Sequence, residues 1–400
     1  MNSFDDIRPY RDDEIPAAMQ RIADSPHFPL LAQYVYPGQD IDRVRNVMRQ
    51  FQNVYDFQHE VMRCVNEQVI ARSTTSFTCE GLEGLDPARR YLFVSNHRDI
   101  MLDACLLQYA LWQHGHETTE ITFGANLMST PLVIDIGKAN KMFRVERGGT
   151  PKEFYASSLH LSEYIRHCIT EKHQSVWIAQ RNGRTKDGND RTDPGLIRMF
   201  GMSRTDDPVQ ALAELNIVPV AVSYEWESCD INKALELYKS RNAPYVKQPG
   251  EDLQSILTGV LQPKGKVQMV CCKPLTTEDI QPAMQTTARR PAIDVKAIAS
   301  LMDERIIAAY KLTPNNYIAA EILRNEDRLT PDEIALLDTL PIHGDQVEPT
   351  YGELVEPTSQ QREDFNAHLA KLELFNVPEP SVLRDIFLRI YATPLLNKLA

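Results

Sequence analysis

The sequence predicts an α/β fold with a mainly parallel central sheet flanked by helices and with helical extensions at both ends. Between about residues 75 and 275, six short apolar runs alternate with helical stretches, and after about 290 such runs fade. This alternation is typical of βαβ units. We therefore expect a helical segment over 1–74, an α/β domain over 75–290 and a helical region over 291–400.

Composition narrows the functional classes. The chain has 400 residues, with 43 basic and 55 acidic side chains, so the formal net charge is −12. An apolar fraction of 42% excludes a disordered chain. The acidic balance makes nucleic acid an unexpected partner and, averaged over the chain, disfavours anionic lipid.

The first residues of the sequence and its cysteines bear on where in the cell the protein is expected. The first residues are acidic and carry no apolar core, and no stretch of about 18 apolar residues occurs. Seven cysteines without a C-x-x-C pair predict neither a disulfide framework nor a zinc site. We expect a cytoplasmic protein that visits the inner membrane peripherally.

Among the individual elements, the first expected helix covers residues 40–72. Asp40 can cap it, and apolar residues recur there in steps of three and four. The apolar runs predict strands at residues 91–95, 121–124, 142–145, 176–179, 217–224 and 267–271.

Capping patterns mark several later helices. Thr150, Pro151 and Glu153 predict a helix that runs to about residue 173, and Asp207–Pro208 opens another. In the last hundred residues we expect helices at 294–310, 330–339, 359–373 and 380–392, with loops at the prolines near 341, 349 and 357.

A histidine follows the first predicted strand of the α/β domain, within the sequence NHRDIMLD from Asn96 to Asp103. At the carboxyl end of a strand, His97 can act as a general base, and a nearby carboxylate can orient its ring. Asp99 and Asp103 compete for that role. In the plainer interpretation, Asn96 and Asp99 only cap the next helix.

Two later loops carry cations. The sequence MFRVERGG places Arg144 and Arg147 between a strand end and a well-capped helix, which suits a phosphate. The sequence IAQRNGRTK places Arg181, Arg184 and Lys186 after the next strand, which suggests an anionic substrate. The plainer interpretation of each is an exposed loop.

Together these blocks resemble the glycerol-3-phosphate and lysophosphatidic acid acyltransferase superfamily over about residues 75–275. NHRDIMLD resembles its first block, FRVERG its second, IAQRNGRTKDG its third, and IVPVAV at residues 217–222 its fourth. The resemblance implies that His97 and Asp103 are catalytic. It also implies a substrate-binding set made of Asn96, Arg98, Asp99, Arg144, Arg147, Asn182, Gly183 and Arg184.

The sequence departs from the family pattern at two places. The family usually separates the His and Asp by four residues, whereas here Asp103 follows after five and Leu102 holds the usual position. We expect Asp103 to take the role, because Leu102 and Leu106 then share the buried side. In the third block, Asn182 stands where the family usually has Glu, which puts the substrate in doubt more than the chemistry.

The resemblance implies an O-acyltransferase. It would move a fatty acyl group from acyl-CoA or acyl carrier protein to a hydroxyl of a glycerol-phosphate-type lipid acceptor, with no metal and no resident cofactor. Backbone N–H groups near the start of the following helix are expected to hold the oxyanion. The alternatives are a thioester or lysolipid hydrolase using Ser95 or Cys105, and a non-catalytic lipid-binding protein. A transient membrane surface is the expected site of encounter.

Overall fold

The computed structural model describes residues 4–128, 130–146, 148–286, 291–340 and 356–400. Its centre is a seven-stranded sheet in the order β1-β7-β6-β2-β5-β3-β4. Neighbouring strands run parallel, except that β6 and β7 are antiparallel. The strands are β1 Thr74–Glu80, β2 Leu92–Ser95, β3 Glu120–Gly124, β4 Met142–Val145, β5 Val176–Ala179, β6 Ile217–Tyr224 and β7 Gly265–Cys271.

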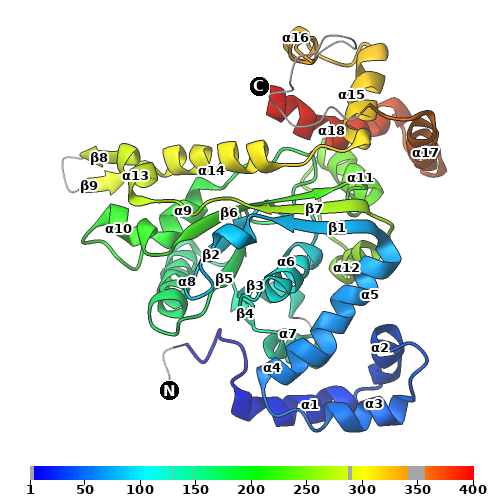
Figure 1. The fold of residues 1–400 in the computed structure, drawn as a ribbon. Helices are drawn as coiled ribbons and strands as arrows, with labels where there is room; N and C mark the ends of the chain where they lie inside the picture. Colours follow the sequence, from blue (N-terminus) through cyan, green and yellow to red (C-terminus); the bar gives the residue numbers. More distant parts are fainter. Residues whose placement is uncertain (1–3, 129, 147, 287–290, 341–355) are drawn as a thin grey trace.

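Helices cover both faces of the sheet (Figure 1). Alternate residues of each buried strand point to opposite faces, so Leu92 and Val94 join one apolar cluster and Phe93 joins the other. The first face carries α8 Pro151–Thr170, α9 Pro194–Phe200, α10 Pro208–Ala213, α13 Thr277–Ile280 and α14 Val295–Ala309. The second carries α5 Arg63–Ser73, α6 Leu102–Gln113 and α7 Pro131–Ala139.

Helical extensions pack at opposite ends of this domain (Figure 1). The N-terminal cluster packs against α7 and contains α1 Ile15–Asp24, α2 Phe28–Val35, α3 Ile41–Met48 and α4 Val54–Phe57. The C-terminal cluster packs on α11 Asp230–Ser240 and contains α15 Pro314–Asn325, α16 Pro331–Leu337, α17 Ser359–Leu369 and α18 Pro380–Leu399. The remaining elements are α12 Glu251–Leu261 and the hairpin β8 Met284–Thr286 with β9 Pro291–Ile293. The α/β fold class is confirmed.

The single helix expected over residues 40–72 was wrong. The chain leaves the helix after Met48, and Asn53 starts a new one by accepting a hydrogen bond from Asp56 N. A π-helical turn, Gln58–Met62, then joins α4 to α5. A polar residue that caps locally competes with helix continuation, which the apolar periodicity alone does not show.

Most other expected elements are present with small shifts of their ends. Thr150 and Glu153 form the capping box of α8, which ends at Thr170. Strand β1 and helix α15 were not expected. β1 is a half-exposed edge strand with few apolar side chains, so its pattern is weak. The loops expected at Pro341 and Pro349 lie outside the described residues.

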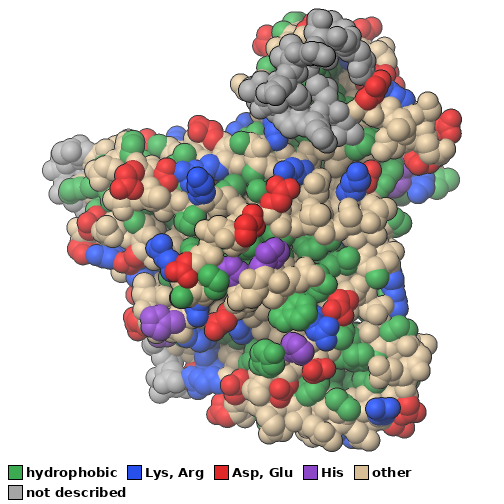
Figure 2. Space-filling view, in the orientation of Figure 1, with side chains coloured by type: hydrophobic (Ala, Val, Ile, Leu, Met, Phe, Trp, Pro, Cys, Tyr) green, Lys and Arg blue, Asp and Glu red, His purple; other side chains and the backbone are tan. Residues whose placement is uncertain are grey.

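The surface carries both signs of charge. Acidic and basic side chains are interspersed with apolar ones over the face seen in Figure 2. Within the described ranges, no helix is both long and apolar enough to cross a bilayer.

Candidate active site

The loop that carries His97 lies at the middle of the sheet. It joins the end of β2 at Ser95 to the start of α6 at Leu102. Because β2 runs parallel to both β5 and β6, the carboxyl ends of the three strands meet at one edge of the sheet. Ligands of open α/β sheets bind at that edge.

His97 contacts Asp103 directly. The His97 Nδ1 atom lies 3.0 Å from Asp103 Oδ2, and both side chains are buried, with exposed fractions of 8% and 0%. An ionised carboxylate at this distance makes Nδ1 the protonated nitrogen and leaves Nε2 as the acceptor. The indole of Trp177 on β5 packs edge-on against the imidazole. The pair has the arrangement of a general base and the carboxylate that orients it.

Asp103 is itself held by three further donors. Its Oδ2 atom accepts from the backbone N–H groups of Arg98 and Asp99, at 2.7 and 2.9 Å. Its Oδ1 atom accepts from the Tyr224 hydroxyl at 2.8 Å. Burial, together with the Asp103 charge, raises the pKa of Tyr224 well above its usual range, so the phenol stays a neutral donor. The longer spacing between His97 and Asp103 therefore still lets the two side chains meet.

Asp99 does not contact His97 through a hydrogen bond in this structure. Its Oδ1 atom accepts from the backbone N–H groups of Met101 and Leu102, both at 2.8 Å, and its Oδ2 atom accepts from the Ser228 hydroxyl. The side chain is almost fully buried. The plainer interpretation of Asp99 as a helix cap fits these contacts, whereas its role in substrate binding stays a prediction.

The backbone N–H groups that were expected to hold the oxyanion already donate hydrogen bonds within the protein. The N–H groups of residues 98 and 99 point to Asp103, and those of residues 101 and 102 point to Asp99. These four groups stabilise the loop, so they are not open to a substrate oxygen in this arrangement.

Asn96 and Arg98 are buried and bonded to the protein, so their expected part in substrate binding stays a prediction. The Asn96 amide donates to Asp190 and exchanges hydrogen bonds with the backbone of Val222 on β6. The Arg98 guanidinium is 1% exposed and forms ion pairs with Asp190 at 2.6 Å and with Glu227 at 3.1 Å. Neither side chain is exposed to a ligand.

Arg98 belongs to a buried network of charged side chains that holds the His97 loop in place. Lys233 of α11 donates to the Arg98 carbonyl at 2.6 Å and forms an ion pair with Glu227 at 2.5 Å. The neighbouring carboxylates hold the pKa of Arg98 well above its usual range although burial lowers it. Sequence reasoning missed Asp190, Glu227 and Lys233, because only the fold brings these distant positions together.

The loop after β5, which carries Arg181, Arg184 and Lys186, lies against the His97 loop. The backbone N–H of Thr185 donates to the His97 carbonyl at 2.7 Å. The preceding side chain, Arg184, is 9% exposed, and among the described residues nothing accepts a hydrogen bond from its Nη1 atom. A buried guanidinium with an unused donor is suited to an anion. Lys186 in the same loop is already paired with Glu236.

The remaining expected binding residues are Gly183, Asn182, Arg144 and Arg147. Gly183 adopts a φ of +76°, which glycine tolerates, and Asn182 beside it is exposed. Arg144 sits on β4, three strands and therefore roughly 14 Å from β2, and pairs with Glu146 at 2.6 Å. The structure does not bring Arg144 against His97. Arg147 lies outside the described residues.

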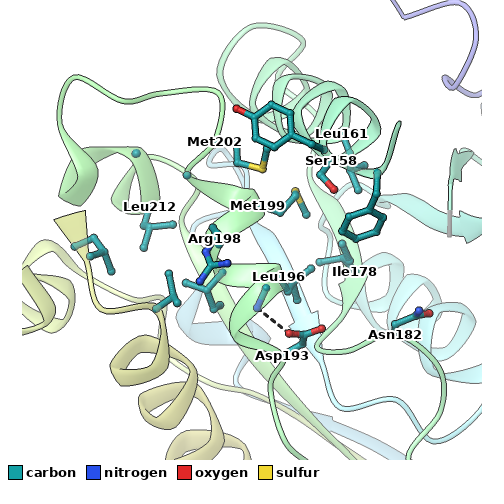
Figure 3. A pocket seen from close by; sticks show the side chains of 18 of the residues that line it. Ser158, Leu161, Ile178, Asn182, Asp193, Leu196, Arg198, Met199, Met202 and Leu212 are labelled. Atoms are coloured by element: carbon teal, nitrogen blue, oxygen red, sulfur yellow. Dashed lines mark hydrogen bonds between the residues drawn. The ribbon is translucent and has the colours of Figure 1, made fainter. Parts of the chain in front are cut away.

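An apolar cavity of about 830 Å³ opens at the same edge of the sheet. Asn182 lies at one side of it, and the labelled side chains then run past Ile178, Leu196 and Met199 to Leu212 (Figure 3). The walls come mainly from α8, α9, α10 and β9. Volumes of about 300–1,000 Å³ are usual for sites that hold small ligands.

The described ranges contain no group of three or more His, Cys, Asp or Glu side chains placed to hold a metal ion. The two nucleophiles considered for a hydrolase are poorly suited to that task. The Ser95 hydroxyl is fully buried and accepts from Trp177 Nε1. Burial raises the pKa of the Cys105 thiol to about 12, so it is protonated near neutral pH.

Comparison with known proteins finds a similarity in the segment that contains His97. Residues 76–223 match the family model described as Acyltransferase. This segment is therefore similar to the acyltransferase family. The match confirms the resemblance drawn from the four sequence blocks, and it contains His97, Asp103 and Arg184.

One solved structure among the similar ones is the 1-acyl-sn-glycerophosphate (LPA) acyltransferase PlsC from Thermotoga maritima. The two chains are 11% identical, with a TM-score of 0.35, over 73% of this chain and 91% of that chain. A search of curated proteins finds no match.

Proposed function

We propose that the acyltransferase domain transfers a fatty acyl group from acyl-CoA or acyl carrier protein to a hydroxyl of a glycerol-3-phosphate or lysophosphatidic acid type acceptor. The observation that carries the proposal is the buried His97–Asp103 pair at the strand ends of a domain that matches the acyltransferase family. Fold alone does not establish function, so the proposal rests on this pair and its neighbours.

The pair gives a simple route for acyl transfer. His97 Nε2 takes the proton of the acceptor hydroxyl, while Asp103 stabilises the imidazolium that forms. The acceptor oxygen attacks the thioester carbonyl carbon and forms a tetrahedral intermediate. The carbon–sulfur bond then breaks, and the leaving thiolate takes the proton from His97. The products are an ester and a free thiol, and no covalent enzyme intermediate forms.

Arg184 is the cation best placed to bind the acceptor phosphate. It is buried, retains an unused donor and belongs to the loop that hydrogen-bonds to His97. An arginine–phosphate contact positions the acceptor near the base and is not altered during proton transfer, so it acts mainly on binding.

Replacing Arg184 with alanine is expected to raise KM for a phosphate-bearing acceptor by about 10- to 100-fold, which corresponds to one charge-assisted contact of about 1.5–3 kcal/mol. Turnover at saturating acceptor should change much less. Lys186→Ala is the control, because Lys186 is paired with Glu236 in the same loop. Steady-state kinetics with the acceptor concentration varied measure this KM. Equal KM values for the Arg184 and Lys186 variants would contradict the assignment.

The apolar cavity is the proposed site of the donor's acyl chain. Its walls are mostly apolar, with some charged side chains among them, and it begins beside Asn182 at the strand ends. A chain in this cavity would place its thioester near the sheet edge that carries His97.

Leu196→Trp, which adds bulk to the cavity wall, is expected to shift the preferred donor to shorter chains. We expect turnover with a 16-carbon thioester to fall at least about tenfold relative to an 8-carbon one, because each buried methylene is worth about 0.8 kcal/mol. Leu374→Trp, at an exposed position outside the cavity, is the control. An unchanged ratio of the two rates would place the acyl chain elsewhere.

Lipid analysis of cells that contain or lack the protein tests the proposal in its natural setting. The missing lipid species identifies the acceptor and the acyl chain together. Restoring the chain should restore that species, whereas restoring the His97→Ala variant should not. A profile unchanged by removal of the protein would argue for the non-catalytic alternative.

A further inference from the structure

Helix α12 exposes a stripe of leucines at the surface of the protein. Leu253, Leu257 and Leu261 follow each other in steps of four and are 56%, 47% and 65% exposed. The side that faces the protein is formed by Ser255 and Gly259, which are buried. Surface helices usually bury their leucines, so this face is suited to an apolar surface outside the chain.

The helix also forms part of the wall around the His97 loop. A Cβ atom at Gly259 would lie 2.2 Å from Asp99 Oδ2, so glycine permits this close packing. Cys229 donates to the Ser255 carbonyl, and Asn126, just beyond β3, donates to Asp252. The exposed leucines therefore lie on the outer side of a helix that covers the site loop.

Cations flank the leucine stripe. Over residues 239–261 the basic side chains are Lys239, Arg241 and Lys247, against the acidic Glu251 and Asp252, a balance of 3 − 2 = +1. This balance is opposite to that of the whole chain, which is −12. Lys247 is paired with Asp252 and Arg241 with Glu379, and all four side chains are partly exposed to solvent. Val246, 74% exposed, adds a further apolar side chain next to these cations. Leucines beside lysine and arginine are typical of helices that lie in a membrane interface.

We propose that α12, together with residues 239–250, docks on an anionic lipid bilayer and holds the His97 loop toward the membrane. The inference rests on the proposed function in one respect: a lipid acceptor must reach His97 from a bilayer. The bilayer is favoured over a protein partner because the leucine stripe lies on the helix that covers that loop, and the proposed acceptor is a lipid. The leucines would enter the apolar layer of the bilayer, and the basic residues of the preceding segment would lie near its anionic headgroups.

Vesicle flotation tests the docking surface without any need for catalysis. The purified full chain is mixed with vesicles of phosphatidylcholine alone or with added phosphatidylglycerol, and bound protein is measured. Leu253→Asp/Leu257→Asp/Leu261→Asp is expected to lower the partition coefficient on anionic vesicles by more than about 100-fold, since one buried leucine is worth roughly tenfold. A Leu→Ser triple variant should give a smaller loss in the same direction.

Leu30→Asp/Leu374→Asp is the matched control, since both residues are highly exposed but lie on other helical segments. It should bind vesicles as the original chain does. The proposal is overturned if the α12 variant and the control bind equally, or if the original chain does not float with anionic vesicles. It is also overturned if sedimentation shows a dimer that only the α12 variant dissociates, because the stripe then binds a second copy.

Turnover of a water-soluble short-chain thioester with a soluble acceptor separates the two proposals. The α12 variant should keep this activity while losing flotation. Flotation that depends on α12 in a chain without any transfer activity would leave docking standing and contradict the proposed function.

Discussion

Alanine in place of His97 is expected to lower acyl-transfer turnover by about 10²- to 10⁴-fold, the usual contribution of a positioned general base. The expectation follows from geometry: His97 Nδ1 is bound to Asp103, which leaves Nε2 to accept the hydroxyl proton. The loss should appear in kcat more than in KM, because the base acts in the transition state. Thiol release in the presence of donor and acceptor measures the effect.

Two further variants test the residues that orient His97 and leave His97 itself unchanged. Asp103→Asn should lose much of the activity, because an amide can no longer stabilise the imidazolium. Tyr224→Phe removes one donor to Asp103 and should lower kcat by less than the Asp103 variant. If Asp99→Asn lowered turnover while Asp103→Asn did not, the assignment of the orienting carboxylate would be reversed.

Methionine in place of Arg98 is expected to destabilise the protein by about 3–5 kcal/mol, because it leaves the buried carboxylates of Asp190 and Glu227 without their cation. The guanidinium is 1% exposed, so water cannot replace it. Urea unfolding followed by circular dichroism measures the change in the free energy of unfolding.

Arg144→Met is the control for the buried network, since Arg144 and Glu146 are about half exposed. Exposed pairs are worth about 0–1 kcal/mol. Adding Asp190→Asn to Arg98→Met should recover part of the lost stability by removing one unpaired charge. Equal midpoints for the Arg98 and Arg144 variants would show that the network does not stabilise the fold.

Local sequence patterns predicted the sheet well. Strands such as β4 and β6 are short apolar runs, and capping residues such as Thr150 and Asp207 mark helix starts by chemistry that acts within four residues. The broken helix between Asp40 and Ser73 was missed because apolar residues kept a helical spacing through the break.

The contacts around His97 could be predicted from the sequence only in part. His97 and Asp103 were found because both lie in one short block. The burial of Arg98 and Asn96 could not be predicted, since it depends on Asp190 and β6, which are distant in sequence. Tyr224 was detectable in principle, as it ends a strand next to β2 at the edge of the sheet where His97 lies.

Transfer of a labelled acyl group by the purified protein tests the central claim most directly. A long-chain acyl thioester is supplied with glycerol-3-phosphate or lysophosphatidic acid, and labelled ester and free thiol are both measured. The account predicts acceptor-dependent ester formation, one thiol released per ester, and loss of both in the His97→Ala variant. Thiol release at the same rate without acceptor, or full transfer by His97→Ala, would contradict it.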